Sequence, residues 1–312
     1  MAKLKIIFMG TPDFAVPCLA TLNENYDIIA VITQPDRPKG RGQKLTPSPV
    51  KEYALAHQLN ILQPEKIKTP EIEKQLESLA PDLIVVVAFG QILSKQILDI
   101  PRLGCINVHA SLLPQYRGAA PIHWSIINGE DKTGITTMFM DVGLDTGDMI
   151  LKEEVVISQE MTTGELHDKL MELGATTLLK TVTQLEQSTA SRTKQNDEDS
   201  SYAPLLTKEL EKINWSLSAQ KIYDLIRGLN PWPVAFCNFK GKKLKLWHTK
   251  VVDNSAVLGE IGNVLALTEQ GFTVQTGAGI LEILELQPES KRKMAAKDFV
   301  CGNQIAINDK LE

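Results

Sequence analysis

The sequence has little that points to a membrane or to secretion. The apolar run at the N-terminus follows Lys5 and is interrupted by Gly10, Pro12 and Asp13. It is therefore much shorter than the roughly 20 residues that a membrane-spanning helix needs. We expect no signal peptide and no membrane span, and we interpret this segment as a first buried strand.

Cysteine is also scarce, with 4 residues in a chain of 312. Cys18, Cys105, Cys237 and Cys301 are far apart, lie in apolar surroundings and show no Cys-x-x-Cys spacing. Zinc sites and disulfide frameworks normally show such paired spacings. We therefore expect reduced thiols in a cytoplasmic protein and no structural zinc.

Several catalytic motifs are missing. The sequence contains no Gly-x-Ser-x-Gly elbow, no Gly-x-x-x-x-Gly-Lys-Ser/Thr loop and no His-Glu-x-x-His, which argues against serine hydrolases, P-loop enzymes and this class of zinc protease. Of the three glycines in a dinucleotide-binding fingerprint, only Gly10 follows the first strand. Asp141, Asp145 and Asp148 lack the further ligands of a calcium loop, so we expect no metal.

The net charge of −5 is the opposite of what binding to phosphate requires. Cations nevertheless cluster in two places, at residues 291–293 and at Lys240, Lys242, Lys243 and Lys245. A solvated charged face is the commoner meaning of such runs. Both interpretations, solvated face and nucleic-acid contact, remain open from the sequence.

The first half of the sequence alternates between strand and helix patterns. Nearly continuous apolar segments at 6–9, 28–33, 83–89 and 105–109 predict strands covered on both faces, and residues 14–22, 50–59 and 70–79 have helical periodicity. Thr11 and Thr69, each before a proline, are N-cap signals. We predict an α/β domain with a parallel sheet, whose ligand crevice lies beyond the carboxyl ends of the strands.

The second half predicts a different architecture. A capping box at Thr162 and Glu165 begins a long amphipathic pattern that ends near Leu185, and the polar residues after it suggest a linker. One helix near 218–229 and five short strand-like runs then predict a small β-barrel. The predicted division is a catalytic domain at 1–187, a linker at 188–205 and a second domain at 206–312.

Asn107 and His109 end one of the predicted strands. Because side chains alternate along a strand, the amide and the imidazole leave the sheet on the same face. The glycine-rich turn around Asp145 supplies a carboxylate that can reach them. Such a set can donate to an oxyanion, transfer a proton and orient an imidazole, as acyl transfer requires. A core histidine and a simple turn carboxylate are the structural alternatives.

A second candidate segment is broken by prolines and glycines between residues 34 and 49 and carries Arg37, Lys39, Arg41 and Lys44. Its composition predicts an irregular loop, and long loops inside compact domains are usually functional. Its cations can contact phosphates. The alternative is a solvated loop.

These motifs resemble a known family. Asn107-x-His109, Ser111-Leu112-Leu113-Pro114-x-Tyr116-Arg117-Gly118 and the Asp145 turn are similar to the signature of the 10-formyltetrahydrofolate-dependent formyltransferases. Residues 8–17, 34–42, 45–51 and 227–233 extend the likeness, from end to end, to the branch that formylates methionyl-tRNA.

The resemblance implies a Rossmann-like formyltransferase domain followed by an OB-like β-barrel domain, with Asn107, His109 and Asp145 as the catalytic trio. It implies a folate pocket lined by Phe89, Gly90, Gln91, Ile92, Leu93, Ser111, Leu112, Leu113 and Pro114. The implied substrates are 10-formyltetrahydrofolate and initiator methionyl-tRNA, and the four cations of the 34–49 loop together with Lys240, Lys242, Lys243 and Lys245 become candidate tRNA contacts. We expect a monomer that uses no metal.

Two relatives of the family share the trio, a 10-formyltetrahydrofolate hydrolase and the sugar-nucleotide formyltransferases. The basic loop at 34–49 favours tRNA over both. A catalytically idle RNA-binding protein is the alternative from another class, and the intact trio disfavours it.

Overall fold

The computed structural model describes residues 3–39, 44–302 and 304–312. It divides into two compact units, and the chain passes between them repeatedly. Unit 1 comprises Met1–Gly118, Thr133–Val155 and His167–Ala203, and unit 2 comprises Ala119–Lys132, Val156–Leu166 and Pro204–Glu312. The predicted division has a single boundary, at 188–205, whereas two segments of the predicted catalytic domain, Ala119–Lys132 and Val156–Leu166, belong to unit 2.

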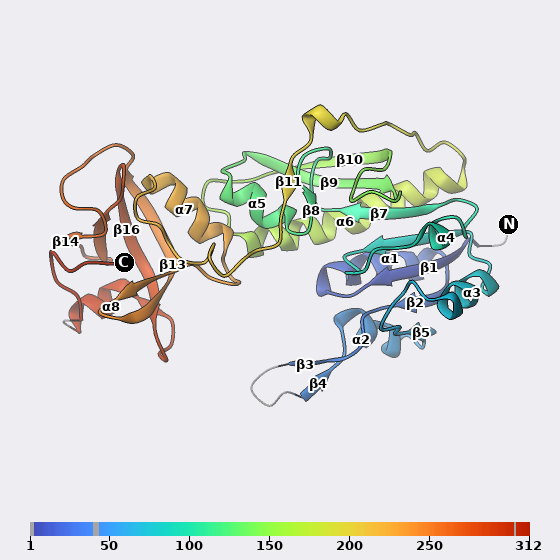
Figure 1. Ribbon diagram of the computed structural model, residues 1–312, viewed down its shortest axis with the longest axis horizontal. Coiled ribbons are helices and arrows are strands. Elements are labelled where there is room, and N and C mark those ends of the chain that lie inside the picture. Colours follow the sequence, from blue (N-terminus) through green and yellow to red (C-terminus); the bar gives the residue numbers. More distant parts are fainter. Residues whose placement is uncertain (1–2, 40–43, 303) are drawn as a thin grey trace. The chain divides into compact units, whose positions relative to one another are not determined.

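Unit 1 contains a seven-stranded sheet in the order β10-β9-β7-β6-β1-β2-β5 (Figure 1). The strands are β1 (Lys5–Gly10), β2 (Asp27–Ile32), β5 (Ile61–Leu62), β6 (Leu83–Val87), β7 (Cys105–His109), β9 (Lys132–Phe139) and β10 (Met149–Val156). Strands β7, β6, β1, β2 and β5 run parallel to one another, and β9 is antiparallel to β7. The predicted α/β class with a parallel sheet is confirmed.

Burial explains why these segments form strands. All five residues of β6 and five of the six residues of β1 are buried, which requires the continuous apolar runs seen in the sequence. The helices of unit 1 are η1 (Asp13–Ala15), α1 (Val16–Asn25), α2 (Pro49–Ala56), α3 (Pro70–Ser78), α4 (Lys95–Leu98), most of α6 (Thr163–Glu186) and η2 (Asp197–Asp199).

Two of the predicted helix caps form, at Thr69 and Thr162, and the one predicted at Thr11 does not. The Thr69 hydroxyl accepts from the amide of Ile72, and Thr162 and Glu165 form the reciprocal capping box. The Thr11 prediction is wrong, because the helix that follows begins after Pro12 and the Thr11 hydroxyl instead donates to the carbonyl of Phe89.

Unit 2 is built on an antiparallel sheet in the order β12-β13-β16-β15-β14, with β17 paired to β16. Its elements are α5 (Pro121–Ile127), α7 (Ala219–Gly228), β12 (Phe236–Phe239), β13 (Lys242–Asp253), β14 (Val264–Leu267), β15 (Phe272–Gln275), β16 (Ile280–Pro288), β17 (Met294–Ala295) and α8 (Ala296–Cys301). The C-terminal segment pairs with both ends of the sheet, through Leu311 with Phe239 and Lys310 with Asn263. This pairing closes the sheet into the predicted barrel.

The segment predicted as an irregular loop is a hairpin in its described part. Strands β3 (Arg37–Lys39) and β4 (Lys44–Thr46) pair antiparallel, so that prediction is wrong. A proline is tolerated here because a two-stranded hairpin leaves edge positions where no backbone donor is needed. Arg41 lies outside the described residues.

The base of the hairpin is held by side chains. The Lys51 ammonium donates to both carboxylate oxygens of Asp36 at 2.9 and 2.7 Å, and the Gln63 amide donates to one of them. These hydrogen bonds lower the pKa of Asp36, and the bond from Gln63 has the largest effect. The hydroxyls of Thr33 and Ser48 share a hydrogen bond across the same base. The hairpin is thereby fixed to the sheet at both of its ends.

Three of the cysteines are packing residues. Cys18, Cys105 and Cys237 are buried, and burial raises the pKa of each thiol to about 12. Such thiols stay protonated at neutral pH and are inert. In the described ranges, none of the helices combines the length and the apolar character needed to cross a bilayer.

A buried ion pair within unit 2 gives a stability prediction. Asp224 and Arg227 are 5% and 7% exposed and lie 2.7 Å apart, and Arg227 also donates to the carbonyl of Met161. Asp224→Ala leaves a buried guanidinium without its counterion, so we expect it to lower the free energy of unfolding of unit 2 by about 3–5 kcal/mol. All four tryptophans lie in unit 2, so tryptophan fluorescence during urea denaturation measures that loss.

The matched control for this prediction is Glu260→Ala, which removes an exposed partner of Lys310 in the same unit. We expect a change below about 1 kcal/mol, because water already screens that pair. Equal losses for the two variants would contradict the prediction.

Candidate active site

Strand β7 presents two polar side chains at its carboxyl end. Asn107 and His109 alternate with the buried Val108, so they leave the sheet on the same side. His109 is only 5% exposed, and Asn107 is half-buried. Among the residues that the structure describes, the Asn107 side-chain amide has no hydrogen-bond partner. Its donors are therefore free for a ligand.

The two ring nitrogens of His109 have different surroundings. Nε2 lies 2.9 Å from the carbonyl oxygen of Tyr116, and Nδ1 lies 3.7 Å from Oδ2 of Asp145. Because a carbonyl only accepts, Nε2 must carry a proton. The longer distance exceeds that of a hydrogen bond, so the Asp145 carboxylate lies beside the imidazole without bonding to it directly. The predicted pairing of these two residues is present in the structure.

The backbone around the histidine is held in unusual conformations. Asp145 has φ +55°, Tyr116 has φ +60° and Gly118 has φ +112°. The Asp145 carboxylate accepts from the Gly118 amide at 2.8 Å. A side chain at Gly118 would come within 2.7 Å of the Tyr202 ring. Left-handed conformations at residues other than glycine concentrate at functional sites because the surrounding structure must enforce them.

A segment that we call the strap, residues 192–203, lies against the Asp145 turn and against the segment 116–118. It includes η2 (Asp197–Asp199) and β11 (Tyr202–Ala203), which pairs in parallel with β8 (Arg117–Gly118). Thr193 exchanges two backbone hydrogen bonds with Met149, and Ser201 accepts from the amides of Tyr116 and Arg117. Sequence reasoning placed this whole segment in the linker at 188–205 and gave it no role, because its side chains are mostly polar and show no periodicity.

The predicted folate residues follow two neighbouring strands. Residues 88–93 come after β6 and residues 111–114 come after β7, and these strands are parallel neighbours in the sheet. Phe89, Leu93, Ser111 and Leu113 are buried, Gly90 and Ile92 are exposed, and Gln91, Leu112 and Pro114 are half-buried. The Phe89 carbonyl accepts from Thr11 and Gln34. The accessible surface of this group is thus made by Gly90, Ile92 and the half-buried residues.

The neighbouring Asp141 carboxylate stabilises the turn itself. Asp141 accepts from the amide of Gly143 and the hydroxyl of Thr146. Within the described ranges, no three or more histidine, cysteine, aspartate or glutamate side chains are grouped as a metal site requires.

The candidate tRNA-contacting cations differ in their partners. Lys240 pairs with Asp309 at 2.9 Å, and Lys243 lies over the Phe236 ring at 3.6 Å. In the part of the chain that the structure describes, Lys242 and Lys245 have no ion-pair partner. Arg37 is exposed and lies 3.5 Å from Glu65, and Lys39 is paired through its backbone with Lys44 in the hairpin.

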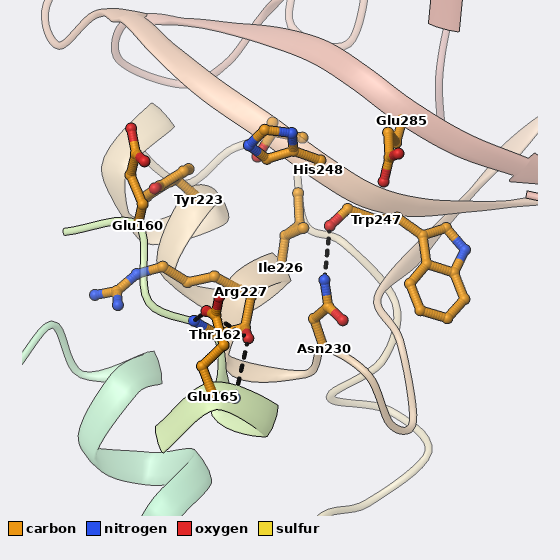
Figure 2. Close-up of a pocket in the computed structure, with 11 residues that line it drawn as sticks. Glu160, Thr162, Glu165, Tyr223, Ile226, Arg227, Asn230, Trp247, His248 and Glu285 are labelled. Atoms are coloured by element: carbon orange, nitrogen blue, oxygen red, sulfur yellow. Dashed lines mark hydrogen bonds between the residues drawn. The ribbon is translucent and has the colours of Figure 1, made fainter. Parts of the chain in front are cut away.

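Unit 2 has a cavity of its own, of about 260 Å³ (Figure 2). Several of its lining groups satisfy one another, including Thr162 with Glu165 and Asn230 with the carbonyl of Trp247. The cavity contains none of the residues predicted for catalysis, folate or tRNA. Sequence reasoning gave no signal for it.

Relatives with assigned names cover almost the whole chain. A methionyl-tRNA formyltransferase of Ruminiclostridium cellulolyticum is 53% identical over 99% of this chain and 99% of its own length. Those of Clostridioides difficile and Alkaliphilus oremlandii are 52% and 54% identical, each over 97% of this chain and at least 97% of their own length.

Solved structures with this fold are more distant in sequence. WlaRD, a sugar 3N-formyl transferase, superposes with a TM-score of 0.69 at 22% identity, over 94% of this chain and all of its own. An N-formyltransferase of Helicobacter canadensis gives 0.66 at 21% identity, over 92% of this chain and all of its own. At this identity the likeness establishes the fold alone.

The formyl transferase family is matched by both of its domain models. Its formyl transferase domain matches residues 3–182, and its C-terminal domain matches residues 205–304. The chain therefore belongs to the formyl transferase family of enzymes.

Proposed function

We propose that this enzyme transfers the formyl group of 10-formyltetrahydrofolate to the α-amine of initiator methionyl-tRNA, in the cytoplasm and in support of translation initiation. One observation carries the proposal. The half-buried Asn107 and the His109–Asp145 pair stand together at a strand end, in a chain more than 50% identical to named methionyl-tRNA formyltransferases. Family membership gives the reaction class, and the relatives suggest the acceptor.

The surface beyond β6 and β7 fits a folate. Ile92 is 66% exposed and the half-buried Leu112 and Pro114 add apolar area, while Gly90 leaves its backbone accessible. A flat pterin ring suits an apolar wall with a few backbone groups. The folate supplies the formyl group on its N10 atom.

The chemistry that we assign to the protein is proton transfer and charge stabilisation. The α-amine forms a bond to the formyl carbon while the bond from that carbon to N10 breaks. The amine loses one proton in this exchange and N10 gains one. The negative charge that develops on the formyl oxygen needs hydrogen-bond donors aimed at it.

Asn107 and His109 are the donors that we assign to that oxygen. The Asn107 amide is free of protein partners, and Nδ1 is the nitrogen of His109 that the Tyr116 carbonyl leaves available. Asp145 orients the charged imidazole and receives the proton of the amine, directly or through a water. The Gly118 amide fixes the carboxylate for this task.

The acceptor distinguishes the proposed function from its alternatives. We expect the enzyme, given 10-formyltetrahydrofolate, to formylate charged initiator tRNA and to leave uncharged tRNA and an amino-sugar nucleotide unmodified, with little release of formate to water. Acid-gel separation of formylated from unformylated aminoacyl-tRNA, run beside chromatography of the nucleotide, measures this. Preferential formylation of the amino sugar, or hydrolysis alone, would refute the proposal.

Loss of one oxyanion donor gives a second prediction. Asn107→Ala should lower kcat by about 10²- to 10³-fold with little change in KM, because the lost interaction forms mainly in the transition state. We expect His109→Ala to lower kcat at least as far. Steady-state formylation kinetics measure both. His57→Ala, which removes an exposed histidine at the C-cap of α2, is the matched control. Near-normal turnover by folded His109→Ala enzyme would overturn the mechanism.

The lysines at residues 240–245 give a third prediction. We expect Lys242→Ala to reduce the slope of log affinity for tRNA against log salt by about one, because one phosphate contact and its released counterion are lost. Lys240→Ala should have a smaller effect, since Asp309 already offsets that charge. Filter binding over a series of salt concentrations measures the slopes. An unchanged slope for Lys242→Ala would make this lysine ordinary solvated surface.

A further inference from the structure

Gln195 connects the two turns that hold the catalytic histidine. Its side-chain nitrogen donates to the carbonyl oxygens of Asp145 and Gly147, at 2.7 and 2.9 Å. Its side-chain oxygen accepts from Nε of Arg117 at 2.9 Å. One amide thus satisfies three groups, two on the aspartate turn and one on the loop that faces His109.

The aspartate turn needs an external support. Asp145 is in the left-handed region, a strained conformation for a residue other than glycine that persists only where the surroundings enforce it. At the exposed tip of the turn, Val142 and Leu144 are 74% and 51% exposed and add little packing. Hydrogen bonds from the strap to the carbonyls of Asp145 and Gly147 supply a constraint that the tip does not.

Arg117 connects the segment 116–118 to the Gln195 side chain. Besides Gln195, it donates to Asp197 at 2.8 Å, and it stands between Tyr116, whose carbonyl faces His109, and Gly118, whose amide holds Asp145. A displacement of Gln195 therefore changes the distance between the imidazole and the carboxylate from both sides.

We propose that Gln195 is a positioning residue for formyl transfer, which sets the Asp145 carboxylate against His109 by clamping the aspartate turn to the Arg117 loop. This inference rests on the proposed function for its catalytic consequence. Only an amide fits the role, because the contact needs two donated hydrogens on one side and an acceptor on the other. A carboxylate keeps the acceptor for Arg117 and places negative charge against two carbonyl oxygens.

Two substitutions test the clamp. Gln195→Met keeps the length of the side chain without its hydrogen bonds, and Gln195→Glu keeps only the acceptor. We expect each to lower kcat by about 10- to 100-fold, the scale of a misplacement of about 1 Å, with KM for folate and tRNA changed less than about threefold. Glu198→Ala, on the same strap with an exposed side chain, should remain at the wild-type rate.

A double mutant separates positioning from general structural damage. Because Gln195 acts through Asp145, Gln195→Met should cost less than about threefold further activity when it is added to Asp145→Asn. Full, multiplicative losses in the double mutant would overturn the inference. Undiminished kcat in folded Gln195→Met and Gln195→Glu enzymes would overturn it as well.

Amide hydrogen exchange tests the clamp without catalysis. Exchange across residues 141–148 should rise at least tenfold in Gln195→Met and stay at the wild-type rate in Glu198→Ala, with no substrate present. Unchanged exchange in Gln195→Met refutes the clamp, whichever substrate the enzyme formylates. If exchange rises while the wild-type enzyme formylates no methionyl-tRNA, the clamp stands and the proposed function fails.

Discussion

The site depends on the placement of one imidazole between a backbone carbonyl and a carboxylate. The Tyr116 carbonyl fixes the proton of His109 on Nε2 and so directs Nδ1 toward Asp145. Both groups that flank the ring come from backbone in left-handed conformations, at Tyr116 and Asp145. The geometry is therefore imposed by contacts from elsewhere in unit 1, since the turns do not favour it by themselves.

The parallel sheet brings the remaining parts together. Strands β6 and β7 are neighbours, so the segments that follow them emerge at the same edge. One carries Gly90 and Ile92, and the other begins after Asn107 and His109. The proposed folate surface and the proposed reacting groups thus become adjacent through strand order, although about fifteen residues of chain separate the segments.

The strap shows how polar sequence can be structural. Its residues are mostly polar, yet Gln195 and Ser201 satisfy backbone groups of the Asp145 turn and of the segment 116–118. Buried or half-buried backbone polar groups must find partners, and a turn in an unusual conformation leaves several without a partner in its own segment. A polar strap is the element that can satisfy them.

The sequence by itself determined the α/β class, the strands β1, β2, β6 and β7 and the pair of side chains at the end of β7, because continuous apolar runs and alternation are local properties. It also indicated the Asp145 turn through its glycines. It did not indicate β5, β9 or β10, which complete the same sheet. Tertiary structure decided the pairing of β3 with β4, the division of the first half of the chain between the two units and the contacts of Gln195. These depend on contacts such as Asp36 with Lys51 and Gln195 with Asp145, which join residues distant along the chain. A local sequence pattern does not identify such partners, because a hydrogen bond depends on which groups the fold brings together in space.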